Sequence, residues 1–398
     1  MSIDGKNLRA QVRRLRPNLV RVLPGRSQPS AYIPPAGLST PMVSIVDRTG
    51  RIIADEQRAV IRFAIQERAG AQVIFAAGTT GEWNRLTPAQ TRIVAQLAVE
   101  ECAGFAQNGE PVEAWIGITA HSVRETLVNL EQALELNAHA AVVAPLAIAD
   151  LESPQELVER QLSEVFARYG RSLPVFLYDN ADIASDGRPA HLHTRDVKQM
   201  AALPYVYGVK VTANKAVLGN YTRAAAHFKR KGQFAIYPGN AYLIFDLFRP
   251  PEGIAGRARG YWNRYLMRAA LPHGIVAGAA NVMPREWRRA WQVSRRHQTI
   301  LMTRYQTVLE QFRDACEFTR DGRPARLTIA CVKTALKEMG VCTSDAVAPG
   351  SPAFQPDERR EFLRRFREVR RRAAASLEPE WTSTSATWSA TGSMRAGA

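Results

Sequence analysis

A lysine lies inside the short apolar segment Pro204–Thr212, whose sequence is Pro-Tyr-Val-Tyr-Gly-Val-Lys-Val-Thr. Its β-branched and aromatic residues, with turn residues at the ends, predict a buried β-strand. Lys210 sits between two valines of that strand, and lysine is almost never fully buried without a partner or a role. Desolvation favours the neutral amine, which is the form that attacks a carbonyl carbon. For Lys210 taken alone, the alternative is a strand-end lysine that reaches solvent.

Three further groups of residues follow predicted strands and could serve the same chemistry. Gly78-Thr79-Thr80-Gly81-Glu82 follows one strand, Tyr178 ends another, and Gly239-Asn240 follows a third. Glycines let a backbone approach an anion, threonines supply N–H and hydroxyl donors, and a tyrosine can carry protons. Each group has a structural alternative: a tight turn for Gly78–Gly81 and core packing for Tyr178. Together with Lys210, they indicate a site that forms an imine with a carbonyl substrate.

The elements that must position these residues alternate regularly from Gly37 onward. Amphipathic helical segments separate most of the apolar strand-like runs, and capping patterns at Thr87, Ser122 and Ser153 mark helix starts. The alternation predicts an α/β fold, a parallel (β/α)8 TIM barrel with additional C-terminal helices, in which chemistry lies at the carboxyl ends of the strands. No Gly-x-Gly-x-x-Gly turn follows the first run, which disfavours the alternative of an open doubly wound sheet. The predicted strands are Leu38–Thr40, Val73–Ala76, Ala114–Ile118, Ala140–Val143, Val175–Tyr178, Tyr207–Lys210, Phe234–Tyr237 and Ile275–Ala277.

Composition divides the chain into four predicted parts. Residues 1–36 form a basic N-terminal extension, and residues 37–285 form the barrel with an insertion near 249–271. Residues 286–345 form C-terminal helices, and residues 346–398 form a basic helix followed by a tail that is disordered from Ala373 onward.

Positive charge is concentrated in a few segments of the chain, whose formal net charge is +16. Residues 1–36 carry a net charge of +6, residues 249–304 carry +9 and residues 356–398 carry +3, so the remainder is about neutral. A nucleic-acid-binding surface would spread its charge differently, and we predict no nucleic-acid partner. The aromatic and basic segment 249–271 predicts a surface helix that docks on a neighbour, with nucleic-acid binding as the alternative. Glu358–Arg372 likewise predicts docking onto the protein, with an anionic membrane as the alternative.

The four cysteines, Cys102, Cys316, Cys331 and Cys342, show no Cys-x-x-Cys spacing, so we expect reduced thiols and neither a zinc site nor a disulfide framework. No uninterrupted apolar run is long enough to span a bilayer, and the N-terminal residues have no signal-like apolar stretch. These observations predict a cytoplasmic protein without a membrane partner, and we expect no metal and no cofactor.

The motifs resemble the dihydrodipicolinate synthase / N-acetylneuraminate lyase family of class I, pyruvate-type aldolases, over roughly Gly37 to Val341. Their order and spacing agree along the whole predicted barrel. The motifs are Gly78-Thr-Thr-Gly-Glu82 with Leu86-Thr87, Phe176-Leu-Tyr-Asp-Asn180, Gly208-Val-Lys210, Tyr237-Pro-Gly239 and Gly274-Ile-Val-Ala-Gly-Ala-Ala-Asn281.

The resemblance implies a barrel with extra C-terminal helices, assembled as a homo-oligomer, a tetramer or a dimer. It implies that Lys210 forms the Schiff base and that Tyr178 is the acid and base of the imine and aldol steps. Thr79 and Thr80 would hold the carboxylate of pyruvate and relay protons, with Thr79 counted among the catalytic residues, and Val276 and Gly239 would bind the keto acid.

Two departures from the synthase branch bear on the substrate. That branch places Pro and then Arg after its Tyr-Asn, and the Arg grips the carboxylate of the aldehyde partner. Here Tyr178 is followed by Asp179, Asn180, Ala181 and Asp182, and the nearest downstream arginine is Arg188. The branch also has a Pro-Tyr-Tyr after strand four, whereas residues 144–148 are Ala-Pro-Leu-Ala-Ile. Since bidentate Arg recognition is hard to replace, lysine biosynthesis is disfavoured.

Three functional hypotheses follow. The leading one is a lyase that forms a lysine Schiff base with pyruvate or a 2-keto-3-deoxy acid and catalyses aldol cleavage, condensation or dehydration. The second is a 4-hydroxy-tetrahydrodipicolinate synthase with altered substrate contacts. The third is a non-catalytic barrel that acts as a binding or regulatory protein through its basic extensions, which the presence of Lys210, Tyr178, Thr79 and Thr80 disfavours.

Overall fold

The structure is a computed structural model of the 398-residue chain. It describes residues 32–106, 111–228, 233–251, 253–261, 270–383, 387–388 and 394–395. Residues Pro34–Ala398 form one compact unit. Most of the predicted basic extension 1–36 and residues 262–269 of the predicted insertion lie outside the described residues.

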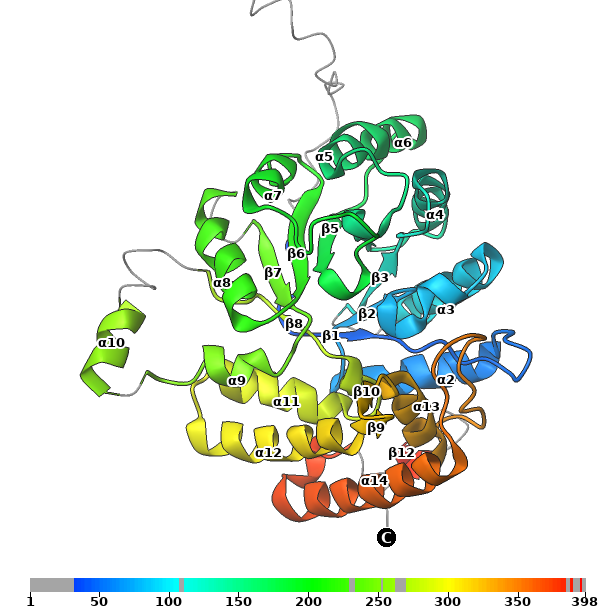
Figure 1. The fold of residues 1–398 in the computed structure, drawn as a ribbon, viewed down its shortest axis with the longest axis vertical. Coiled ribbons are helices and arrows are strands. Elements are labelled where there is room, and N and C mark those ends of the chain that lie inside the picture. The colour runs from blue at the N-terminus through cyan, green and yellow to red at the C-terminus, as the bar shows by residue number, and fades with distance from the viewer. Residues whose placement is uncertain are drawn as a thin grey trace, which may run out of the picture. The chain divides into compact units, whose positions relative to one another are not determined.

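Eight parallel strands form the sheet, in the order β7-β6-β5-β4-β3-β2-β1-β8 (Figure 1). A backbone hydrogen bond from His273 N to Ile236 O, 2.9 Å long, links the segment before β8 to β7 and brings the two edges together. The chain is therefore a (β/α)8 barrel with C-terminal helices, and the predicted fold class is confirmed. The strands are β1 (Leu38–Pro41), β2 (Val73–Ala76), β3 (Glu113–Gly117), β4 (Ala140–Val143), β5 (Val175–Asn180), β6 (Val206–Thr212), β7 (Ala235–Pro238) and β8 (Ile275–Val276).

The predicted cap residues begin three of the helices that surround the barrel. Ser122 Oγ accepts from Glu125 N at 3.2 Å and Ser153 Oγ accepts from Glu156 N at 3.1 Å. Thr87 Oγ1 accepts from Gln90 N at 3.3 Å, which satisfies a donor that the first helical turn leaves unpaired. The helices of the barrel layer are α2 (Ala54–Ile65), α3 (Pro88–Ala106), α4 (Val123–Glu135), α5 (Pro154–Glu156), α6 (Leu162–Tyr169), α7 (Thr194–Ala201) and α8 (Lys215–Ala224).

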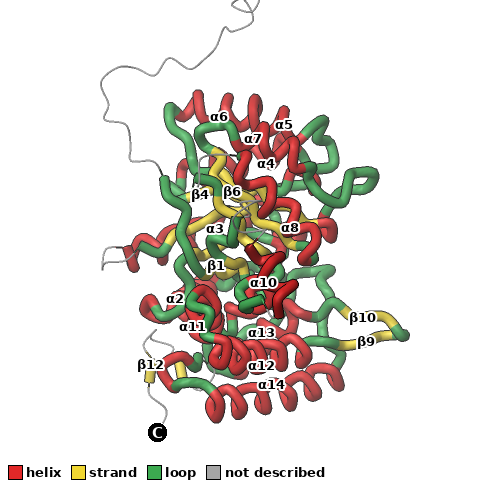
Figure 2. Tube along the Cα trace, turned by 90° about the vertical axis from the view of Figure 1, so that its left-hand side faces the viewer, coloured by secondary structure: helices red, strands yellow, loops and turns green. Residues whose placement is uncertain are grey.

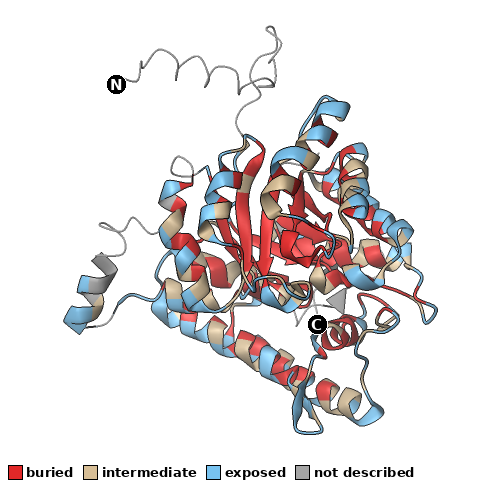
Figure 3. Ribbon diagram, turned by 45° about the horizontal axis from the view of Figure 1, so that its top comes forward, coloured by how far each residue is buried: buried red, intermediate tan, exposed pale blue. Residues whose placement is uncertain are grey.

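Aromatic side chains fill the barrel interior beneath the carboxyl ends of the strands. The Trp115 ring stacks on Phe176 with centroids 3.9 Å apart and meets the edge of Tyr237 at 5.2 Å. The Tyr237 hydroxyl donates to Pro35 O at 2.6 Å, at the amino end of the barrel. Figure 3 shows the strands buried and the outer helix faces exposed. An interior filled by side chains in this way is a packed core, and in such barrels chemistry lies at the carboxyl ends of the strands.

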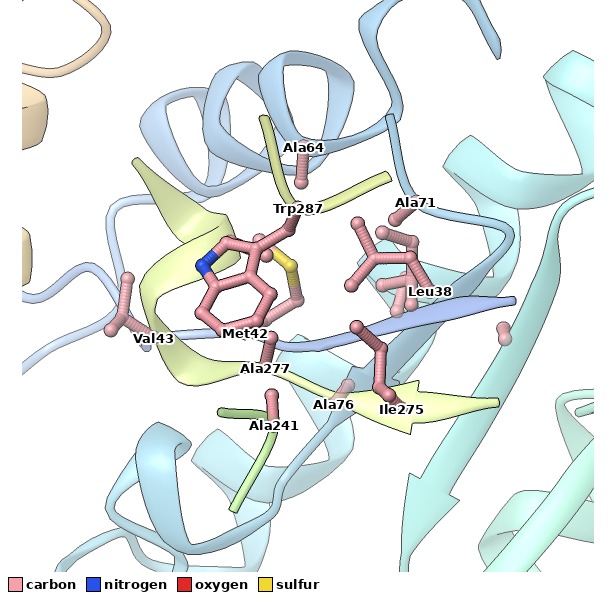
Figure 4. Packing of buried hydrophobic residues seen from close by; sticks show 14 of the residues in the cluster. Leu38, Met42, Val43, Ala64, Ala71, Ala76, Ala241, Ile275, Ala277 and Trp287 are labelled. Carbon is pink, nitrogen blue, oxygen red and sulfur yellow. The ribbon is translucent and has the colours of Figure 1, made fainter. Parts of the chain in front are cut away.

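The C-terminal helices pack beside β1 and β8. Trp287 of α11 (Pro284–Arg295) is 1% exposed and lies among Leu38, Met42 and Ala277 (Figure 4). Figures 1 and 2 place α14 (Pro356–Ser376) beyond α12 (Thr299–Ala315) and α13 (Thr328–Glu338), away from the barrel, and the hairpin β9 (Phe318–Arg320) and β10 (Arg323–Ala325) joins α12 to α13.

The apolar face predicted for Glu358–Arg372 docks on the protein. Phe362 and Phe366 of α14 are fully buried, and the Phe366 ring contacts Phe312 of α12 with centroids 5.9 Å apart. The predicted docking of this helix onto the protein is therefore confirmed. Among the described residues, no helix combines the length and apolar character needed to cross a membrane.

The end of the chain is more ordered than its composition suggests. Ser383 N donates to Glu286 Oε1 at 2.8 Å, and the Tyr305 hydroxyl donates to Glu378 at 2.6 Å. The prediction of disorder from Ala373 onward is therefore wrong up to Ser383. Between β7 and β8 the chain forms α9 (Leu243–Leu247) and α10 (Gly253–Tyr261). The predicted docking of segment 249–271 depends on the aromatic side chains of Tyr261, Trp262 and Tyr265, and these lie outside what the structure describes.

Candidate active site

Lys210 lies on the inner face of β6 near its carboxyl end. In the sheet it is level with Tyr178 of β5 and Tyr237 of β7, so the three side chains share one face. Only 6% of Lys210 is exposed. Its Nζ atom lies 3.6 Å from the ring centroid of Tyr178 and 5.1 Å from that of Phe75. The aromatic faces therefore hold the amine at the top of the packed interior.

The Tyr178 hydroxyl is hydrogen-bonded to three polar side chains. Asn180 Nδ2 donates to it at 3.0 Å, Thr212 Oγ1 donates at 3.4 Å, and Thr79 Oγ1 shares a hydrogen bond with it at 3.3 Å. Burial on its own would raise the pKa of this phenol, but the charge on Lys210 and the hydrogen bonds from Thr212 and Thr79 outweigh burial. The pKa of Tyr178 therefore lies below its ordinary value of 10.

Thr79 and Thr80 belong to a single 3-10 turn, Thr79–Gly81, that follows β2. Residues with left-handed backbone bracket this turn, Ala77 with φ 55° and Glu82 with φ 59°. Gly81 has no room for a side chain, because a Cβ there would lie 2.9 Å from Met42 O. Thr80 faces the loop after β8, since its Oγ1 would lie 3.7 Å from a Cβ placed on Gly278.

Gly239 lies beside Lys210 at the carboxyl end of β7. A Cβ at this position would lie 2.0 Å from Thr212 Oγ1 and 3.3 Å from Lys210 Cε, so only glycine leaves both side chains in place. Val276 ends β8 and pairs with Ser39 of β1, and it is 2% exposed. The structure thus brings Lys210, Tyr178, Thr79 and Gly239 into one cluster. The contact of Val276 with a keto acid stays a prediction.

Two neighbours of the Tyr178 hydroxyl had no assigned role in the sequence prediction. Thr212 follows Lys210 by two positions, and Asn180 follows Tyr178 by two. Because side chains in a strand alternate between faces, this spacing puts each of them on the same face as its partner. The sequence carries this signal: Thr212 ends the apolar segment Pro204–Thr212, and Asn180 lies just beyond the predicted strand Val175–Tyr178.

The Asp179 side chain points away from the Tyr178 hydroxyl, because neighbouring residues of a strand face opposite sides of the sheet. This side chain is fully buried, with His191 Nδ1 2.9 Å from Oδ2 and the Tyr221 hydroxyl donating to the same oxygen at 3.0 Å. Leu192 N donates to Oδ1 at 3.0 Å. The carboxylate therefore holds the loop before α7 against α8, on the outer face of β5.

The other charged residues near that turn also have partners. Asp182 is exposed, and its Oδ1 atom lies 3.6 Å from Nη2 of Arg326. Arg188 donates to the carbonyl oxygens of Ala149 and Leu151. Leu146, Ala147 and Ile148, which follow β4, are buried. In this structure the turn after Tyr178 presents an amide, Asn180, to the site. Within the described ranges, no group of three or more His, Cys, Asp or Glu residues could hold a metal ion.

Comparison with known proteins identifies the family of the barrel. The model of the Dihydrodipicolinate synthetase family matches residues 34–247. A 4-hydroxy-tetrahydrodipicolinate synthase of Stenotrophomonas maltophilia (strain K279a) is 24% identical over 309 residues, which are 77% of this chain and 87% of that protein.

Solved structures share the fold. A prophage protein from E. coli K12, which belongs to the dihydrodipicolinic acid synthase family and is in complex with pyruvate, has a TM-score of 0.64 at 19% identity, covering 84% of this chain and 98% of that chain. The sialic acid aldolase of Ruminococcus gnavus has a TM-score of 0.65 at 14% identity, covering 86% of this chain and 99% of that chain.

Proposed function

Because this chain belongs to the dihydrodipicolinate synthetase family, whose model matches residues 34–247, we propose that it is a lyase that forms a Schiff base between Lys210 and a 2-keto acid. One observation carries the proposal: the Lys210 amine lies 3.6 Å from the Tyr178 ring centroid, and the hydroxyl of that ring is hydrogen-bonded by Thr79, Asn180 and Thr212. A nucleophile and a proton carrier with a lowered pKa are therefore adjacent at the carboxyl ends of the barrel strands.

The reaction would begin when Lys210 loses its proton and its amine adds to the C2 carbonyl carbon of the keto acid. Loss of water gives an imine, and its protonated form draws electrons from the neighbouring carbon. In the cleavage direction, the bond between C3 and C4 breaks, an aldehyde leaves and an enamine remains on Lys210. In condensation, the enamine carbon attacks the aldehyde. Tyr178 would take the proton from the C4 hydroxyl in cleavage and return it in condensation.

The carboxylate of the keto acid would lie against the turn Thr79–Gly81. The two threonines offer hydroxyl and backbone N–H donors, and both side chains are partly exposed. Gly239 would leave room beside Lys210 for the bound acid, because a side chain there would meet Lys210 Cε.

A hydroxylated partner fits the rest of the site better than an anionic one. Asn180 and Thr212 are uncharged and lie at the Tyr178 hydroxyl, and Arg188 is engaged by backbone carbonyls. Amide and hydroxyl groups can both donate to and accept from sugar hydroxyls. We therefore favour pyruvate formed from, or condensed into, a 2-keto-3-deoxy acid derived from a sugar.

A second candidate is a 4-hydroxy-tetrahydrodipicolinate synthase with altered substrate contacts. The similarity to a protein of that name from Stenotrophomonas maltophilia supports it. Against it stands the turn after Tyr178, which offers Asn180 and no arginine. In either case the proposed assembly is a homo-oligomer, and the proposed partner is a small 2-keto acid.

Borohydride trapping tests the proposal directly. The protein is incubated with a panel of 2-keto acids that includes pyruvate, reduced, digested and analysed by mass spectrometry. We expect a reduced adduct on Lys210 that Lys210→Arg abolishes, since a guanidinium stays protonated and cannot condense. Exposed Lys198 and Lys215 are internal controls, and Lys215→Arg is the matched variant that keeps the adduct. Equal labelling of these lysines would refute the assignment to Lys210. No labelling by any acid would favour the non-catalytic barrel.

A further inference from the structure

Glu82, which follows Thr79 by three residues, forms an ion pair with Lys333 in the interior of the protein. The Lys333 Nζ atom lies 2.5 Å from Glu82 Oε2, and the two side chains are 0% and 1% exposed. Among the ion pairs that the structure describes, no other has both side chains so nearly excluded from water. Burial lowers the pKa of Lys333, and attraction to Glu82 offsets this only in part.

The remaining hydrogen bonds of the pair connect three separate parts of the chain. Glu82 Oε1 accepts from Ala348 N at 2.9 Å, and Lys333 Nζ donates to Ala346 O at 3.0 Å. Ser344 Oγ donates to Val46 O at 2.6 Å, which ties the same segment to the loop after β1. The turn after β2, helix α13 and residues 344–348 are thus joined at one buried point.

The Glu82–Lys333 ion pair also fixes the backbone conformation of Glu82. Glu82 adopts the left-handed conformation, with φ 59° and ψ 36°, and its N–H donates to Thr79 O at 3.1 Å. A residue other than glycine in this region is strained and persists only where its surroundings fix it. Here Lys333 and Ala348 N hold the carboxylate from two sides. They therefore stabilise the backbone conformation that closes the Thr79–Gly81 turn.

We propose that the Glu82–Lys333 pair is a positioning device that holds the Thr79 hydroxyl at Tyr178, so that helix α13 takes part in the barrel site. Thr79 and Glu82 are linked through a single backbone hydrogen bond, and Thr79 Oγ1 lies 3.3 Å from the Tyr178 hydroxyl. A turn that loses its anchor gains freedom at Glu82, and the Thr79 hydroxyl is then no longer fixed at this distance. Only the kinetic part of this proposal rests on the proposed function.

The main test is the double variant Glu82→Gln/Lys333→Met. It removes both charges together, and replacing a buried ion pair in this way is often neutral for stability, whereas removing one partner strands a buried charge. Glu82→Asp is the second variant: it keeps the charge, shortens the side chain by one methylene and tolerates the left-handed backbone at least as well. Glu101→Gln is the matched control, because Glu101 pairs with Arg58 and Arg62 between α2 and α3, away from the turn.

Two readouts need no substrate. Hydrogen–deuterium exchange of residues 78–83 should become about tenfold faster in both Glu82 variants, because the opening of the turn costs less free energy. The absorbance titration of Tyr178, isolated by subtracting a Tyr178→Phe reference with the same Glu82 substitutions, should shift to higher pH, because the Thr79 hydrogen bond lowers this pKa. Glu101→Gln should change neither. With an active keto acid, imine trapping on Lys210 should persist while kcat falls about tenfold, the effect of a misplaced proton carrier.

Unchanged exchange and unchanged titration in a folded Glu82 variant would show that the pair only stabilises the fold, and the proposal would be wrong. If the double variant does not fold, Glu82→Asp decides by the same measurements. Failure to trap any keto acid would refute the proposed function and would leave these two structural readouts intact.

Discussion

Single residues set the chemistry of the site through the Tyr178 hydroxyl. It has hydrogen-bond partners on three segments, Thr79 after β2, Asn180 on β5 and Thr212 on β6. A phenol with so many partners is held in one orientation, and its pKa is lowered despite burial. Both properties suit a group that takes a proton and returns it in the same cycle.

The Tyr178→Phe variant should keep keto-acid binding and imine trapping, because Lys210 retains its aromatic contact with the ring. Turnover should fall by roughly 10²–10⁴, the usual effect of losing a general acid or base. Tyr205→Phe is the control, since the Tyr205 hydroxyl donates to Val158 O outside the site. Steady-state kinetics beside borohydride trapping measures both quantities. Normal turnover in Tyr178→Phe would make this tyrosine a packing residue.

The Thr212→Val variant should shift the ionisation of Tyr178 to higher pH. Burial alone raises this pKa, and the hydrogen bond from Thr212 is one of the contributions that reverse the effect. If the phenolate is the catalytic base, the rising limb of the pH–rate profile should move to higher pH as well. An absorbance titration with Tyr178→Phe as reference measures the shift directly. If Tyr178 ionises at the same pH in Thr212→Val as in the wild type, Thr212 does not donate a hydrogen bond to the Tyr178 hydroxyl in solution.

At the scale of elements, strand β7 places Gly239, a residue without a side chain, next to Lys210. In the Gly239→Ala variant, the new methyl group would lie 2.0 Å from Thr212 Oγ1 and 3.3 Å from Lys210 Cε. One of these side chains must move, so we expect imine trapping to slow by about one to two orders of magnitude, as misplaced reacting groups do. Gly104→Ala in α3 is the matched control, because no heavy atom lies near its Cβ position. A trapping rate equal to wild type in Gly239→Ala would show that the site absorbs the methyl group.

The loop from β5 to α7 bears on the choice of substrate. Aspartate semialdehyde should be a poor partner, since no arginine follows Tyr178 to bind its carboxylate. A missing charge-assisted contact costs about 1.5–3 kcal/mol, or roughly one to two decades in specificity. Comparing kcat/KM for condensation of pyruvate with aspartate semialdehyde against cleavage of a panel of 2-keto-3-deoxy acids tests this. If the semialdehyde reaction is the fastest, Arg326, which lies beside Asp182, is the first residue to replace.

Features that depend on residues close together in the sequence could be predicted, whereas contacts between distant residues could not. Strands such as Val73–Ala76 and Ala140–Val143 are buried on both faces, so their continuous apolar runs predict them directly. Lys210 and Tyr178 could be placed because a barrel puts every strand's carboxyl end on one side. The partners of Asp179 could not, since His191 and Tyr221 lie 12 and 42 positions away. The Glu82–Lys333 pair spans 251 positions, and nothing local to either residue indicates it.

At the scale of the whole molecule, the four described cysteines should be inert toward alkylation in the folded protein. All four are buried free thiols. Burial raises the pKa of Cys102 and Cys316, and it raises that of Cys342 to about 12, so little thiolate exists at neutral pH. Iodoacetamide labelling followed by mass spectrometry should modify them only after unfolding. Rapid modification of one cysteine in the native state would reveal local opening of the helices that cover it.

The amino end of the barrel limits how far the chain can be shortened from its first residue. A truncation that stops at residue 31 should leave activity and melting temperature unchanged, because the residues that it removes are rich in charge and poor in periodic apolar positions. A truncation that also removes Pro34 and Pro35 should lower the melting temperature, because both residues make hydrogen bonds to the barrel. His273 Nε2 lies 2.7 Å from Pro34 O, and the Tyr237 hydroxyl donates to Pro35 O at 2.6 Å. Each bond closes the amino end of the barrel, and Tyr237 belongs to the aromatic layer that supports Lys210.

At the other end, removal of residues 384–398 should be neutral and removal of residues 374–398 should not. The longer deletion removes two hydrogen bonds: the one from Ser383 N to the buried Glu286, and the one from the Tyr305 hydroxyl to Glu378. Hydrogen bonds to charged groups contribute about 1.5–3 kcal/mol each, so the free energy of unfolding should fall by several kcal/mol. Denaturant unfolding of the two truncations, with turnover measured on each, separates the cases. Equal stability of the two would mean that residues 377–383 do not dock on α11 and α12 in solution.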